Sequence, residues 1–136
     1  VHNIISSLIE TDSKYNTAVS TALGGASSYL VVDTPSIAKE LIYYLKNNNL
    51  GRATFYPISV ITGRNITSDV MDIIEREEGY IDIASNLVSY DNKYSNIISN
   101  VLGSVVIVDS IDTANIISNK ITFFIITYFI ESVGKI

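Results

Sequence analysis

The chain has 136 residues, of which 47% are hydrophobic and 17% charged, a composition that supports a packed core and excludes a disordered chain. It has no cysteine and one histidine, which excludes disulfides, thiolate metal sites and multi-histidine metal sites. The net charge of −5 and isoelectric point near 4.6 argue against broad nucleic-acid binding, and no apolar stretch is long enough to predict a membrane-spanning helix.

The first predicted element is a helix over residues 15–23, preceded by Asp12 and followed by Gly24. Its apolar residues recur at the spacing of one helical face: Tyr15, Ala18, Val19, Ala22 and Leu23. Asp12 stands where a side chain would accept the free N–H groups at the start of the helix. Gly24 and the adjacent Gly25 predict the turn that ends it.

A buried strand over residues 29–32 and a second helix follow. Thr34 and Pro35 open this helix, with the Thr34 hydroxyl as cap and proline at the first helical position. The spacing predicts a buried face formed by Ile37, Ala38, Leu41, Ile42 and Leu45. Gly51 marks the turn after the helix.

The middle of the chain predicts a short strand within residues 51–58 that is closed by Pro57. A polar loop over residues 62–65 comes next, followed by an amphipathic helix over residues 69–78 that ends at Gly79. This helix joins the two halves of the chain. The tail, residues 121–136, predicts one or two strands.

Residues 1–24 align without gaps on residues 80–103, at an offset of 79. The identical pairs are Ile4/Ile83, Ser6/Ser85, Leu8/Leu87, Asp12/Asp91, Lys14/Lys93, Tyr15/Tyr94, Ser20/Ser99, Leu23/Leu102 and Gly24/Gly103. At an offset of 76, residues 29–33 then match residues 105–109. The repeat predicts an α+β fold of two pseudo-symmetric lobes, each a small sheet flanked by helices. We place lobe one at about residues 1–66 and lobe two at about 67–136.

These motifs resemble the hinge domain of SMC (structural maintenance of chromosomes) proteins, of the bacterial type, over about residues 1–120. The resemblance is carried by Leu-Gly-Gly at residues 23–25, Leu-Val-Val-Asp at 30–33 and Gly-Arg-Ala-Thr-Phe-Tyr-Pro-Ile at 51–58. In the second half it is carried by Gly-Tyr at 79–80, Ala-Ser at 84–85, Asp-x-Lys-Tyr at 91–94, Leu-Gly at 102–103 and Val-Val-Ile-Val-Asp at 105–109.

The resemblance implies a module at the far end of a long antiparallel coiled coil, which forms a homodimer by placing lobe one of each copy against lobe two of the other. It implies a cytoplasmic, nucleoid-associated protein with its ATPase in a separate head domain. Kleisin-type subunits are expected only at that head. For this chain it implies no enzyme activity, no cofactor and no membrane contact.

Two positions depart from the family pattern. Asn3 stands where a glycine usually follows His2, and asparagine tolerates positive φ better than most residues. In the tail the family usually has a glycine-rich segment at the dimer contact, whereas this chain has Gly134 alone. The resulting candidate interface residues are Ile126, Thr127, Tyr128, Phe129, Ile130 and Gly134.

The remaining candidate residues favour structural roles. Gly24 and Gly25 follow a helix and lack the Gly-Lys-Ser/Thr ending of a phosphate loop, so a helix stop is favoured. Asp33 and Asp109 each follow a buried strand and precede a helix, where a carboxylate offsets the helix dipole, so both are interpreted as caps. Gly103 is interpreted as a turn like Gly24.

Arg52 and Arg64, with Lys39 and Lys46, form a candidate DNA-contact patch, although the acidic balance predicts weak and salt-sensitive binding. Two other functions remain open. A small-molecule sensor would have a closed polar pocket between the lobes, and an enzyme would place the carboxylate of Asp33 or Asp109 exposed in a cleft.

Overall fold

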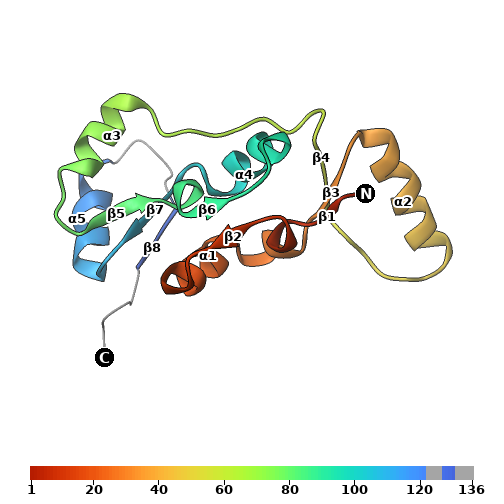
Figure 1. Ribbon diagram of the computed structural model, residues 1–136, viewed down its shortest axis with the longest axis horizontal. Coiled ribbons are helices and arrows are strands. Elements are labelled where there is room, and N and C mark those ends of the chain that lie inside the picture. The colour runs from red at the N-terminus through yellow and green to blue at the C-terminus, as the bar shows by residue number, and fades with distance from the viewer. Residues whose placement is uncertain (122–126, 131–136) are drawn as a thin grey trace.

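The structure is a computed structural model that describes residues 1–121 and the backbone of residues 127–130. It is an elongated molecule in which lobe one and lobe two lie at opposite ends of a shared centre (Figure 1). Lobe one contains β1 (Asn3–Ile4), η1 (Ile5–Ser7), β2 (Glu10–Thr11), η2 (Ser13–Tyr15), α1 (Asn16–Leu23), η3 (Gly24–Ser28), β3 (Leu30–Val32), α2 (Pro35–Asn47) and β4 (Phe55–Pro57). Here η denotes a 3-10 helix.

Lobe two begins with α3 (Ser68–Glu75), which has no counterpart among the described elements of lobe one. The rest repeats the earlier order: β5 (Tyr80–Ile83), η4 (Ala84–Leu87), β6 (Val88–Ser89), η5 (Asn92–Tyr94), α4 (Ser95–Leu102), β7 (Val105–Val108), α5 (Ile111–Lys120) and β8 (Thr127–Ile130). The linker, residues 58–67, runs from β4 past α4 to α3 (Figure 1).

The two main sheets have the same topology and the same register. Their strand orders are β1-β3-β4 and β5-β7-β8, each with an antiparallel first pair and a parallel second pair. Asn3 pairs with Val31 in lobe one, and Asp82 pairs with Ile107 in lobe two. These residues differ by the offsets of 79 and 76 found in the sequence. The predicted duplication and the two-lobed α+β fold are therefore confirmed.

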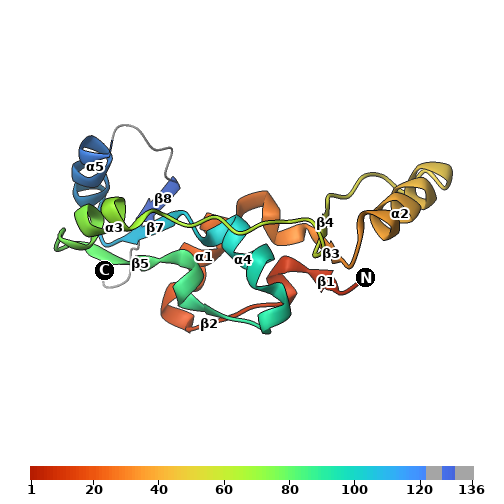
Figure 2. The same ribbon diagram turned by 90° about the horizontal axis from the view of Figure 1, so that it is seen from above.

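The centre of the molecule lies on the pseudo-twofold axis that relates the lobes. Strands β2 and β6 pair antiparallel, and Glu10 pairs with Ser89, its own equivalent at an offset of 79. Helices α1 and α4, which are also equivalent, pack against each other beside this pair (Figure 2). Their buried side chains form the largest core, which includes Val19, Leu23, Ile98 and Leu102. Because both lobes contribute to it, neither half of the chain buries this core alone.

An aspartate caps the start of each of the two central helices, α1 and α4. The carboxylate of Asp12 accepts from the N–H of Lys14 at 3.2 Å, and that of Asp91 accepts from the N–H of Lys93 at 3.1 Å. Each acid caps a 3-10 turn that continues into α1 or α4. The predicted capping by Asp12 is confirmed, and its equivalent Asp91 caps in the same way.

The second helix of each lobe differs in how much of its apolar face is covered. In lobe two, Val70 and Ile74 of α3 are buried in one core with Ala114 and Ile117 of α5. Of the face predicted for α2, Ala38 is buried, Ile37, Leu41 and Leu45 are half-buried, and Ile42 is 50% exposed. The prediction of a buried α2 face was therefore wrong in part. Helix α3 packs against the apolar face of α5, but no described element covers the apolar face of α2 in this way.

Candidate dimerisation surface

Strand β4 forms an edge of the lobe-one sheet that no other described strand covers. The N–H of Leu30 donates to the C=O of Thr54 at 2.9 Å, so Thr54 and alternate residues after it turn their backbone groups toward β3. Phe55 and Pro57 therefore point their backbone groups outward. Proline has no N–H, so within β4 the Phe55 N–H is the donor that a further strand would use.

Strand β8 occupies the equivalent position at the edge of the lobe-two sheet. It pairs in parallel with β7, and Tyr128 lies opposite Val106 as Phe55 lies opposite Leu30. Among the described strands, nothing pairs with its other edge. Uncovered edges present free N–H and C=O groups and favour pairing with another chain. The duplication thus gives the molecule two equivalent edges, one in each lobe.

A groove lies between the second half of α2 and the loop that leads from it to β4. Its volume is about 630 Å³, and we call it the α2 groove. Ile42 and Leu45 contribute apolar side chains, Lys46 and Arg52 contribute positive charges, and Gly51 and Ala53 line the loop side. Gly51 has a φ of +93°, which a residue with a side chain rarely adopts, so the glycine sets the course of this loop. Exposed Tyr43 and Tyr44 lie on the same helix.

The linker is held against α4 by Ser99. The Ser99 hydroxyl accepts from the N–H of Arg64 at 3.1 Å and donates to the C=O of the same residue at 2.9 Å. Asn100 donates to the C=O of Thr62 at 3.0 Å. A Cβ on Gly103 would lie 2.0 Å from the Arg64 oxygen, so the approach requires glycine at that position. These contacts fix the path by which β4 connects to lobe two.

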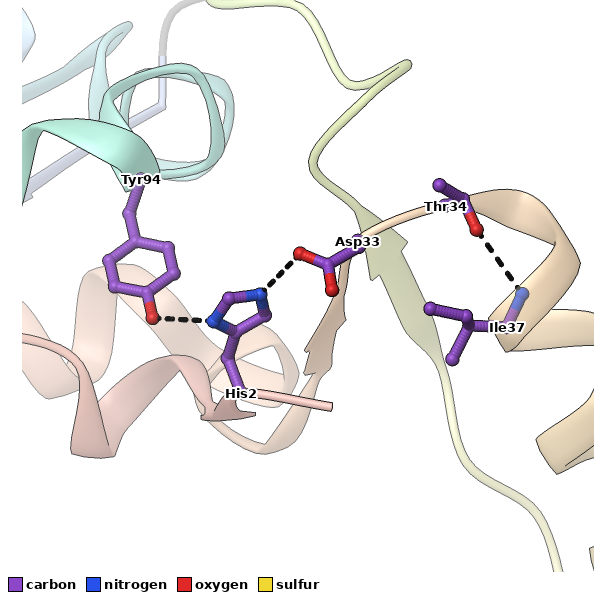
Figure 3. A network of polar contacts seen from close by, with 5 residues as sticks. All are labelled: His2, Asp33, Thr34, Ile37 and Tyr94. Atoms are coloured by element: carbon purple, nitrogen blue, oxygen red, sulfur yellow. Dashed lines mark hydrogen bonds and ion pairs between the residues drawn. The ribbon is translucent and has the colours of Figure 1, made fainter.

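His2 joins the start of the chain to both lobes. Its Nε2–H donates to the Asp33 carboxylate at 2.7 Å, and its Nδ1 lies 2.8 Å from the hydroxyl of Tyr94 (Figure 3). In the neutral imidazole Nδ1 accepts from that hydroxyl. The hydrogen bond from His2 holds the pKa of Asp33 below its usual value. The only histidine of the chain is therefore placed in a structural contact and not on a free surface.

The expected capping by Asp33 and Asp109 is corrected, because the cap is one residue later in both lobes. Thr34 Oγ1 accepts from the N–H of Ile37 at 3.4 Å (Figure 3), and Ser110 Oγ accepts from the N–H of Thr113 at 3.2 Å. These shorter side chains reach the first turn directly. Asp33 instead accepts from His2.

Asp109 accepts a hydrogen bond from the Thr113 hydroxyl at 3.0 Å. This pair presses against Gly79, where a Cβ would lie 1.9 Å from Thr113 Oγ1. Gly79 is therefore required for this close approach. The predicted helix stop at Gly79 was wrong, because α3 already ends at Glu75.

The candidate turn glycines fall into different classes. Gly24 has a φ of +54°, as the helix-stop interpretation expects. Gly103 has a φ of −71°, so its role is the close approach of the linker and not a left-handed turn. Gly25 has neither a positive φ nor any atom within 4 Å of an added Cβ, and nothing in the structure requires glycine there.

The other candidate residues are not gathered into one site. Arg52 lines the α2 groove, whereas Arg64 lies on the linker over α4. Of the predicted interface residues, Thr127–Ile130 form β8, while Ile126 and Gly134 lie outside the described residues. Another hollow, of about 170 Å³, is lined by residues between 6 and 27, so neither it nor the α2 groove is bounded by both lobes.

The described residues contain no cluster of three or more His, Asp or Glu side chains that would hold a metal ion. In the same part of the chain, no helix is both long and apolar enough to cross a membrane.

The duplicated fold, with two sheet edges that no strand of the described residues covers, defines a class of protein: a small two-lobed module suited to pairing with a second sheet. Residues 1–118 match the family of SMC proteins' flexible hinge domains. The chain is 38% identical over 115 residues to the chromosome partition protein Smc of Bacillus subtilis, and 37% identical over 111 residues to that of Clostridium kluyveri. These matches cover 85% and 82% of the chain but about a tenth of either relative.

Solved hinge structures agree with the fold. The hinge domain of Geobacillus stearothermophilus, described as an asymmetric dimer, superposes with a TM-score of 0.85 at 40% identity, over 87% of this chain and 48% of that one. The hinge of Pyrococcus furiosus superposes with a TM-score of 0.72 at 32% identity, over 83% and 57%. The chain belongs to the SMC hinge domain family, and it is a hinge module and not in itself an enzyme.

Proposed function

We propose that this chain joins two copies of an SMC protein by homodimerisation through its sheet edges. The observation that carries the proposal is the pair of equivalent edges that no described strand covers, β4 in lobe one and β8 in lobe two. Pairing β4 of each copy with β8 of the other would cover both edges at once and close a symmetric dimer. The similarity to a hinge described as an asymmetric dimer supports pairing between two copies.

The proposal extends to the longer protein of which a hinge is part. The relatives are named chromosome partition proteins, and the chain spans about a tenth of their length. We infer that the hinge joins the far ends of two coiled-coil arms, in the cytoplasm at the chromosome, with the ATPase and kleisin-type subunits at a separate head. We place the boundary between the lobes near residue 66, in the linker.

Contact with DNA is a weaker proposal. Arg52 shares the α2 groove with Lys46, so one basic patch exists, but Arg64 is not part of it. Binding through so few cations would be weak and would fall steeply with salt. Removal of the Arg52 charge by Arg52→Gln should lower the affinity for a DNA duplex, whereas Arg64→Gln should change it less.

The edge proposal is tested with one charge placed on each edge. Phe55→Lys on β4 and Tyr128→Lys on β8 should each give folded monomers, because a charge at a paired edge opposes association. Thr17→Lys, on an exposed position of α1, is the matched control and should remain a dimer. Light scattering reports the molar mass, and a thermal melt separates loss of pairing from loss of folding. Folded dimers of both edge variants would contradict the proposal.

A further inference from the structure

The β4 edge is tied to lobe two by the side chain of Asn100 on α4. The Tyr56 hydroxyl of β4 donates to Asn100 Oδ1 at 3.0 Å, and Asn100 Nδ2 donates to the C=O of Thr62 in the linker, also at 3.0 Å. A carbonyl oxygen can only accept, so the amide nitrogen faces Thr62 and the amide oxygen faces Tyr56. Asn100 therefore uses both ends of its amide to bridge the strand and the linker.

The two ends of this bridge enclose the turn that follows β4. Within the turn, the N–H of Ile61 donates to the C=O of Pro57 at 3.1 Å. The ring of Tyr56 packs against the ring of Tyr29, with centroids 5.0 Å apart, and both rings lie against the central core. Asn100 thus fastens to α4 a strand end that is already packed on its inner face.

Strand β4 is short, so contacts outside its sheet matter to its position. It has three residues and, among the described strands, pairs with β3 alone. Successive side chains of a strand point to opposite faces, so Tyr56 points toward the core and α4 while Phe55 and Pro57 lie on the other face. The outward backbone groups of Phe55 are therefore placed by the way Tyr56 is held. An edge fixed before association has less conformational entropy to lose on pairing than a mobile one.

The equivalent position in lobe one lacks this amide. Thr21 of α1 lies 79 positions before Asn100, and it is exposed. The adjacent serines are the same in both lobes, but Ser99 contacts the linker, whereas the Ser20 hydroxyl donates to the C=O of Thr17 within its own helix. The Asn100 bridge therefore does not follow from the duplicated fold.

We propose that Asn100 is a positioning residue for dimerisation, through which lobe two fixes the β4 edge of its own chain in the conformation that pairs with a second copy. The inference rests on the proposed dimer and names the residue that prepares one of its edges. Asn100 acts through Tyr56 and the linker, without contact with the partner. Because a symmetric dimer uses the β4 edge twice, a weakening of about threefold at each edge multiplies to about tenfold.

The test is the dimer dissociation constant, measured by sedimentation equilibrium. Asn100→Ala removes both hydrogen bonds of the bridge and should raise the dissociation constant about tenfold. Tyr56→Phe removes the hydroxyl alone and should raise it by a smaller factor. Thr21→Ala, the matched control at the equivalent position of α1, should leave it unchanged.

A merely structural role for Asn100 would lower the free energy of unfolding and leave the dissociation constant of the folded chain unchanged. Urea unfolding in the Phe55→Lys background, in which the charge opposes association, measures the effect on folding alone. In a double-mutant cycle, Tyr56→Phe should add little to the dissociation constant when residue 100 is already alanine, because both substitutions break the same bridge.

Folded Asn100→Ala and Tyr56→Phe variants that dimerise as tightly as Thr21→Ala would overturn the inference and leave the proposed dimer intact. Additive effects of the two substitutions would also contradict it. If Asn100→Ala does not fold, Tyr56→Phe decides the question, because it removes one hydroxyl and keeps the packing of the ring. A wild-type chain that is monomeric at every concentration would instead overturn the proposed function itself.

Discussion

Gly103→Ala is expected to destabilise the fold strongly, although alanine is a better helix former than glycine. The added Cβ would lie 2.0 Å from the Arg64 carbonyl oxygen and 2.5 Å from that of Ser99, and both are backbone atoms. The linker must therefore move away. Overpacking of this kind costs about 1–3 kcal/mol, and the two hydrogen bonds between Ser99 and Arg64 contribute about 1 kcal/mol each. We expect a loss of about 3–4 kcal/mol, after a small gain in helix propensity.

Urea unfolding at a fixed protein concentration measures this loss. Two matched glycines calibrate it. Gly24→Ala removes a residue with φ +54° and should cost about 1–3 kcal/mol through backbone strain alone. Gly25→Ala has no nearby atom and should change the free energy of unfolding by less than about 0.5 kcal/mol. If Gly103→Ala were as stable as Gly25→Ala, the linker contact with α4 would be refuted.

Three further predictions concern the caps and two titrating groups. Thr34→Ala should lower the free energy of unfolding by about 1 kcal/mol, whereas Asp33→Asn should leave the start of α2 intact by circular dichroism. Because the pKa of Asp33 is lowered, its hydrogen bond with His2 stabilises the fold at pH values above the usual carboxyl pKa, and this stabilisation is lost as the pH falls through the lowered pKa. In the His2→Ala variant, NMR titration should find the Asp33 pKa returned toward its usual value. Burial, followed by the Asp82 charge, raises the pKa of Tyr80 to about 12, so its contribution is complete below about pH 10 and is lost toward pH 12. Tyr80→Phe should remove that alkaline decline in urea titrations.

The duplicated architecture could be predicted from the sequence because its signals are local and occur twice. The aspartate before α1, the glycine after it and the apolar strand that follows recur at fixed offsets in lobe two. Each signal acts on neighbouring residues, through a cap, a helix stop or burial of a strand. Their recurrence predicted two equivalent lobes, and the strand registers of both sheets follow the same offsets.

The sequence-based predictions that the structure corrects concern contacts between distant parts of the chain. The apolar spacing of α2 resembles that of α5, but burial depends on whether another helix covers it, which periodicity does not encode. The sequence does not indicate the contact made by Ser99, because its partner is a backbone group of Arg64, 35 residues away. The sequence places Asp33 next to α2, but in the structure its carboxylate accepts a hydrogen bond from His2, 31 residues away. The adjacent Thr34 supplied the cap, as its position before Pro35 indicated.

The measurement that tests the central claim most directly is the molar mass of the wild-type chain by light scattering across a dilution series. The account predicts a mass near twice 14.9 kDa at tens of micromolar, falling toward 14.9 kDa on sufficient dilution. A mass of 14.9 kDa at every concentration, from a chain shown to be folded by its thermal melt, would contradict it.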